Sequence, residues 1–141
     1  MEDTFSPRIA ATLNHRLGQD ATSPHIADVV VAVYREIEGA LTPIVGPGGV
    51  VALYQRSLHL AKATHHWIDI SSPAQTPRVD FSTLRTLLAQ QTDETALAGG
   101  VEILERFSRL LVSLIGLSLS EQLLGAVWIQ PPAGSPVQDA P

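Results

Sequence analysis

The chain has 141 residues, a net charge of −5 and no cysteine. Its length suits one domain, and apolar residues, at 45% of the chain, are sufficient for a core that must be mainly aliphatic. The absence of cysteine excludes disulfides, thiol nucleophiles and thiolate metal sites, and the acidic balance without a lysine or arginine block argues against a nucleic-acid partner.

Two stretches bear on targeting and membrane insertion. The first four residues include the acidic Glu2 and Asp3, and no apolar segment follows them, so the sequence predicts no signal peptide. The longest nearly uncharged run, 110–128, is interrupted at its centre by Ser118, Ser120 and Glu121. A membrane span tolerates polar residues least at its centre, so we interpret this run as two buried helices. We expect a cytoplasmic protein with no membrane partner.

A serine followed by proline opens each of the first two predicted helices. After Ser6, apolar residues recur every four positions until Gly18, and this short helix should dock on the rest of the domain or on a second subunit. After Ser23, an apolar spacing of three and four predicts a helix over 24–42. The Gly-Pro-Gly-Gly stretch at 46–49 must then break the helix.

Two further helices are predicted on either side of a serine- and proline-rich stretch. The apolar spacing predicts a helix over 50–67, and residues 68–79 have the composition of a surface loop. Asp80 is the expected N-cap of a shorter helix whose apolar residues begin at Phe81.

The most apolar helix is predicted from Asp93, as its N-cap, to residue 115, and it should be the central one. Gly99 and Gly100 lie inside it and together cost about 1–2 kcal/mol relative to alanine, which favours a close helix crossing at this point. After Gly116, residues 118–121 have the Ser-x-x-Glu pattern of a capping box, which predicts the start of a last helix.

These elements predict an all-α fold, a single bundle of five or six helices over residues 1–128. Its core should consist of the helices at 24–42, 50–67 and 94–115. Residues 129–141 contain four prolines and no apolar periodicity, so we expect a disordered tail.

Two segments of the chain resemble each other. Ile44-Val45-Gly46 and Leu114-Ile115-Gly116 both end a long predicted helix with an aliphatic pair and a glycine, and a further helix follows each. An internal duplication would explain this pair, and so would the ordinary tendency of helices to end at glycine.

Basic and titratable side chains gather on the polar side of the helix predicted at 50–67. The candidate ligand-binding residues on this side are Arg56, His59, Lys62 and His66. Residues three or four apart on a helix share a face, so His59 and Lys62 should lie together.

The segment His59-Leu60-Ala61-Lys62-Ala63 resembles the core of histidine-containing phosphotransfer (HPt) domains, in which an exposed helix carries His-x-x-Lys and a small residue. The resemblance implies that His59 accepts a phosphoryl group from a response-regulator aspartate and that Lys62 stabilises the phosphate charge. It covers about five residues of a helical domain of suitable size. The family usually has glycine where Ala63 stands and a small residue where Leu58 stands, and these departures weaken the match.

No metal, cofactor or catalytic centre is expected. Adjacent histidines on a helix, such as His65 and His66, point about 100° apart. His59 and His66 would be about 10 Å apart along the axis, too far to share one zinc ion. The glycine-rich stretch at 46–49 lacks the Gly-Lys-Ser/Thr ending of a phosphate-binding loop, so a tight bend is the simpler interpretation.

The leading functional expectation is a non-enzymatic interaction or regulatory module that forms a homodimer or binds a protein partner. Val31, Val112 and the helix at 6–18 offer apolar surface outside the main stripes. One alternative is a phosphotransfer domain with His59 as phosphoacceptor. A second alternative is a small-ligand domain, and its cavity residues would be Tyr54, Trp67, Phe107 and Trp128.

Overall fold

The computed structural model of the chain describes residues 6–68, 81–125, 127 and 128. Within them it contains five helices and no strand: α1 (Ser6–Leu17), α2 (Ser23–Lys62), α3 (Phe81–Ala89), α4 (Asp93–Ile115) and α5 (Leu117–Leu124). The predicted all-α bundle is confirmed. The cap at Asp80, the tail at 129–141 and all of the loop predicted at 68–79 except Ile68 lie outside the described residues.

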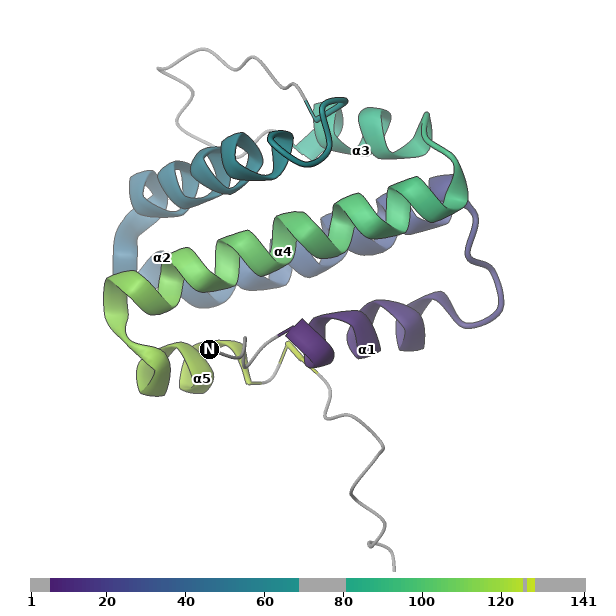
Figure 1. The fold of residues 1–141 in the computed structure, drawn as a ribbon. Helices are drawn as coiled ribbons and strands as arrows, with labels where there is room; N and C mark the ends of the chain where they lie inside the picture. The colour runs from purple at the N-terminus through teal and green to yellow at the C-terminus, as the bar shows by residue number, and fades with distance from the viewer. Residues whose placement is uncertain (1–5, 69–80, 126, 129–141) are drawn as a thin grey trace, which may run out of the picture.

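Helix α2 folds back on itself as a helical hairpin (Figure 1). Its first arm covers 23–45 and its second arm 47–62, and Gly46 between them has φ 82° and ψ 160°. This backbone region is open essentially only to glycine, which has no Cβ. The break expected over 46–49 is therefore a bend at one residue. Pro47 is tolerated in the first turn of the second arm because no helical partner exists there for an N–H group.

Helix α4 contacts every other helix, as expected for a central element, and α2 does the same. The first arm of α2 and α4 start together, since the Ser23 backbone N–H donates to Asp93 Oδ1 at 2.8 Å. The predicted close crossing at the glycine pair is confirmed. A Cβ atom on Gly100 would lie 2.7 Å from Val30 Cγ2, and one on Gly99 would overlap the ring of Trp67.

The two halves of the described chain repeat one pattern, and the hydrogen bond from Ser23 to Asp93 joins residues 70 positions apart. Gly116 has φ 92° and ψ 159°, nearly the conformation of Gly46. At the same shift, seven pairs of positions are buried in both long helices: Ile26 and Ala96, Val29 and Gly99, Val30 and Gly100, Val33 and Ile103, Tyr34 and Leu104, Ile37 and Phe107, Leu41 and Leu111. The match is not complete, because Ser23, Ala27, Val31 and Ser108 are buried and their equivalents are not.

The repeat extends beyond the long helices. Thr22 and Thr92 both precede them in extended conformation. Four buried residues at the chain's end stand 70 positions after four buried residues of the second arm of α2: Ser120 after Val50, Leu124 after Tyr54, Val127 after Ser57 and Trp128 after Leu58. The contact of Val30 with Gly100 joins equivalent positions, as an approximate twofold axis between two units requires. This geometry favours an internal duplication.

The helix predicted over 50–67 ends five residues early, at Lys62. Backbone N–H groups of Thr64 and His65 still bond to Ala61, but the chain then turns so that Trp67 packs over Gly99 of α4. Residues 63–67 have the apolar spacing of a helix, but the packing of Trp67 against α4 stabilises the turn more than a continued helix would.

Two predicted caps are wrong. Thr92 caps α4 by accepting a hydrogen bond from the Thr95 N–H at 3.2 Å, and this leaves the Asp93 carboxylate for its bond to Ser23. The capping box at 118–121 does not form, because α5 begins at Leu117 directly after the Gly116 bend.

Helix α2 is the one described helix that is long and apolar enough to cross a membrane, a property shared by core helices of globular proteins. The bend at Gly46 divides it, and its buried residues pack on α4. The uncharged run at 110–128 includes the end of α4 and all of α5, as expected, but it is not buried throughout, because Leu114 and Leu117 are exposed.

An ion pair that the sequence did not indicate joins α1 to α2. Arg16 Nη1 and Nη2 donate to Glu36 Oε2 and Oε1 at 2.7 and 2.8 Å. These hydrogen bonds lower the pKa of Glu36, so the folded state binds this proton more weakly than the unfolded chain does. The stabilisation is present above the pKa of the unfolded chain and is lost as the pH falls through the lower pKa of the folded protein.

We therefore expect Glu36→Gln to lower the free energy of unfolding at pH 7 by about 0.5–1 kcal/mol, the range for partly exposed pairs. The difference from the wild type should shrink toward zero below about pH 4. Urea unfolding of both proteins at pH 7 and at acid pH measures it. A difference that does not depend on pH would contradict this assignment.

Candidate functional site

The side chains predicted to bind a ligand lie on one exposed side of the bundle. Arg56, His59 and Lys62 are exposed on the second arm of α2, while Leu58 and Ala61 between them are buried. The predicted alignment of His59 with Lys62 is thus consistent with the burial pattern. His66 is also exposed, but it lies in the turn after α2 and not on the helix.

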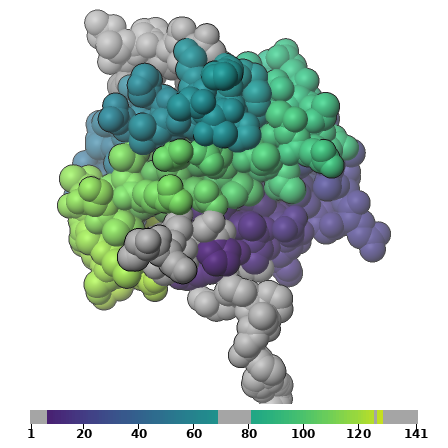
Figure 2. Space-filling model, viewed as in Figure 1, coloured from purple at the N-terminus to yellow at the C-terminus, as the bar shows by residue number. Residues whose placement is uncertain are grey.

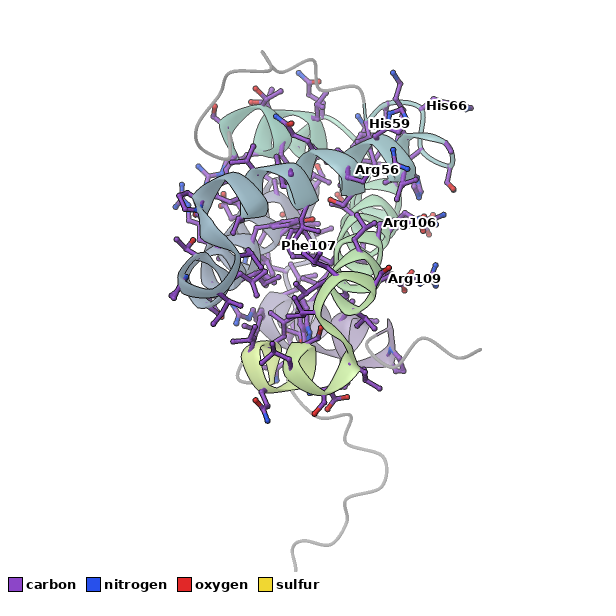
Figure 3. All side chains as sticks on the ribbon, turned by 90° about the vertical axis from the view of Figure 1, so that its left-hand side faces the viewer. Arg56, His59, His66, Arg106, Phe107 and Arg109 are labelled. Atoms are coloured by element: carbon purple, nitrogen blue, oxygen red, sulfur yellow. The ribbon has the colours of Figure 1, made fainter. Side chains whose placement is uncertain are left out.

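Helix α4 adds two arginines that the sequence did not assign to this site. Figure 3 shows Arg106 and Arg109 on the same side of the molecule as Arg56, His59 and His66. We define the basic face as Arg56, His59, Lys62, His66, Arg106 and Arg109. It holds four of the nine lysines and arginines of a chain with net charge −5. Because these residues are separated by about 50 positions, only the packing of α4 against α2 could show that they share a side.

Acidic side chains offset part of this charge. Glu102 Oε2 accepts from Arg106 Nε at 2.7 Å, and this i, i+4 pair holds the Arg106 side chain. The His59 imidazole makes no hydrogen bond or ion pair with another residue in the part of the chain that the structure describes. An exposed imidazole between two cations can accept a phosphoryl group or bind an anion.

No three histidine, aspartate or glutamate side chains among the described residues gather closely enough to hold a metal ion. Of the four aromatic residues expected to line a ligand cavity, Tyr54, Phe107 and Trp128 are buried in the core and Trp67 is partly buried against it. Tyr54 and Phe107 pack edge-on against Tyr34, with ring centroids 5.2 and 5.3 Å away. Trp67 covers Gly99, about two helical turns along α4 from Phe107.

A second surface lies where both glycine bends meet one end of the bundle (Figures 1 and 2). The large hydrophobic side chains that are exposed in the described part of the chain are all found here: Ile44 at 50%, Leu114 at 60% and Leu117 at 45%. No charged residue occurs between Glu38 and Arg56, or between Arg109 and Glu121. We call the residues at 43–48 and 113–118 the uncharged end.

The uncharged end is not where apolar surface was expected. Val31 is fully buried, Val112 packs against the core, and α1 buries Ile9, Leu13 and Leu17 against the rest of the bundle. By contrast, Leu114 lies in the run at 110–128 that was expected to form two buried helices. The one sequence signal for this surface was the similarity of the two aliphatic–glycine segments.

Neither a scan against protein-family models nor searches of curated proteins and of solved structures return a match to this chain.

Proposed function

We propose that this chain is a non-enzymatic helical interaction module that contacts a protein partner through its uncharged end. The observation that carries the proposal is that Ile44, Leu114 and Leu117 are exposed and lie within two residues of the glycine bends, which share one end of the bundle (Figure 1). Single exposed apolar residues are ordinary, whereas a cluster of them marks binding surfaces. Burial of this end would also require no desolvation of charge, because both segments that form it lack charged side chains.

Site-specific photo-crosslinking in cells that produce the full chain tests this proposal. A benzophenone amino acid replaces Leu114 in one strain and Ala98, an exposed residue of α4 away from the bends, in the other. We expect covalent protein adducts from position 114 and not from position 98, and we expect Ile44→Asp to abolish them. Equal labelling from both positions, or no adduct from either, would contradict the proposal.

Phosphotransfer is a second candidate function because of the arrangement around His59. The imidazole is exposed, Lys62 lies one turn further along α2 and Arg56 one turn before it. Both cations can stabilise the charge of a phosphoryl group on the ring. The buried Leu58 occupies a position where the phosphotransfer family usually has a smaller residue.

The test is transfer of labelled phosphate from a phosphorylated response regulator to the purified chain. If His59 is the acceptor, the wild type and His15→Gln should both take up acid-labile label and His59→Gln should not. His15 is a suitable control because it is also exposed on a helix, α1. Persistence of the label in His59→Gln would exclude this function. So would the absence of label on the wild type with every response regulator of the cell that produces this chain.

A further inference from the structure

We propose that the partner at the uncharged end is a second copy of this chain, so that two molecules join end to end as a symmetric homodimer. This inference rests on the proposed function, since it names the occupant of the same surface. Three properties of that surface favour a second copy: its lack of charge, its internal repeat and the residues at its border.

The lack of charge makes the end compatible with itself. In a twofold-symmetric dimer the same surface patch of both copies forms the interface. A patch with net charge would therefore face a patch of the same charge. Each copy carries a net charge of −5, which opposes close approach through charged faces. The exposed residues of the two bends are aliphatic residues, proline, glycine and serine. Two such ends therefore meet without electrostatic cost.

Because of the internal repeat, the uncharged end consists of two similar parts, the bend at Gly46 and the bend at Gly116. Ile44 before Gly46 corresponds to Leu114 before Gly116, and both are half exposed or more. A second copy that approaches along the approximate twofold axis can place the bend at Gly46 against the partner's bend at Gly116, twice over. In each of these two contacts, aliphatic side chains of one copy pack against the backbone of the partner's bend, which glycine leaves uncovered because it has no side chain.

The border of the surface disfavours a lipid bilayer as occupant. Bilayer-binding ends carry Trp or Tyr anchors and lysine or arginine near the surface. Here the two stretches without charged residues are 39–55 and 110–120. Glu38 precedes the first and Glu121 follows the second, and the only aromatic residue in either stretch, Tyr54, is 2% exposed. Arg56 and Arg109, at the other borders, belong to the basic face, so cations border the end on that side and carboxylates lie at the two remaining borders.

Ile44, Leu114 and Leu117 are the only large hydrophobic side chains exposed in the described part of the chain, so we expect a small interface and weak association. An interface below about 1,200 Å² is typical of transient complexes. We accordingly expect a dissociation constant in the range of about 10–300 μM, so that monomer and dimer are both measurable. An apolar contact of this kind should hardly depend on salt, in contrast to association through the basic face.

Sedimentation equilibrium of the full chain from about 5 to about 500 μM tests the proposal. We expect the wild type to approach the dimer mass, and the double variant Ile44→Glu with Leu114→Glu to bind itself at least tenfold more weakly. The matched control is Ala32→Glu with Ala98→Glu, which adds the same charge at exposed positions on the sides of the bundle. It should dimerise within about threefold of the wild type once salt screens the added charge.

The absence of cysteine allows a test of position. Under mild oxidation an equimolar mixture of Ile44→Cys and Leu114→Cys should form a disulfide-linked dimer of twice 15.1 kDa, because position 44 meets position 114 of the partner, while Ala98→Cys should remain a monomer. Circular dichroism confirms that all variants keep the helical fold.

Each outcome decides between the two proposals. A wild type that is monomeric at about 500 μM, or a double glutamate variant that dimerises normally, overturns self-association. If adducts with a different protein still form from position 114 in cells, the interaction module stands and only its partner differs. Binding to neutral or anionic phosphatidylcholine–phosphatidylglycerol vesicles by the wild type, with loss in the glutamate variant, would assign the end to a lipid surface and overturn the proposal.

Discussion

Replacement of Phe107 by alanine is expected to lower the free energy of unfolding by about 3–5 kcal/mol, the range for the loss of a fully buried aromatic ring. Phe107 is fully buried, and its ring meets the Tyr34 ring at 84° with centroids 5.3 Å apart. The change removes the buried ring, leaves a cavity and breaks this edge-to-face contact. Urea unfolding monitored by circular dichroism measures the loss. Since domains of this size have about 5–15 kcal/mol in total, this loss is a large share of the stability of the protein.

Tyr34→Phe serves as the comparison, because it keeps the ring and removes only the hydroxyl. The hydroxyl lies 3.2 Å from Ser57 Oγ and 3.4 Å from the Ile103 carbonyl. Burial raises the pKa of this hydroxyl well above its usual range, so it remains a donor at neutral pH. Ser57 Oγ keeps its own bond to the Tyr54 carbonyl, and we expect a loss of only about 1 kcal/mol. A Phe107→Ala loss no larger than this would contradict the packing around Tyr34.

Gly100→Leu is expected to lower the free energy of unfolding by about 2–3 kcal/mol, although leucine favours helices over glycine by nearly 1 kcal/mol. The reason is the crossing with α2, where even a Cβ atom would lie 2.7 Å from Val30 Cγ2. Gly39→Leu is the matched control within a helix, since nothing lies within 4 Å of a Cβ at that position. It should raise stability by up to about 1 kcal/mol. Effects of the same sign at both positions would contradict the close crossing.

The repeat supplies a stricter version of this experiment. Val30 and Gly100 occupy equivalent positions and contact each other, so exchange of the two residues preserves the total volume at the crossing. Val30→Gly and Gly100→Val should each be destabilising, and the double variant should recover at least half of the summed loss. Strict additivity of the two losses would argue against the approximate twofold relation.

Local sequence signals determined the helical elements. The apolar spacing, the serine–proline starts and the glycines predicted all five helices, and Gly46 and Gly116 are where the chain bends. These features depend on backbone conformation and on hydrogen bonds within a few residues, so they are encoded close to where they act. The close crossing at Gly99 and Gly100 was also predictable, because two adjacent glycines inside a helix need a packing reason.

The tertiary structure decided which apolar residues remain exposed. Val31 and Leu114 both belong to helices with apolar residues on most sides, yet one is buried and the other is 60% exposed. Periodicity defines no unique buried face on such a helix, because burial depends on which other helices pack against it. The same holds for the joining of Arg16 to Glu36 and of Arg106 and Arg109 to the basic face. The sequence by itself thus determined where this chain is helical and where it bends, and packing between distant helices decided which surfaces are left for a partner.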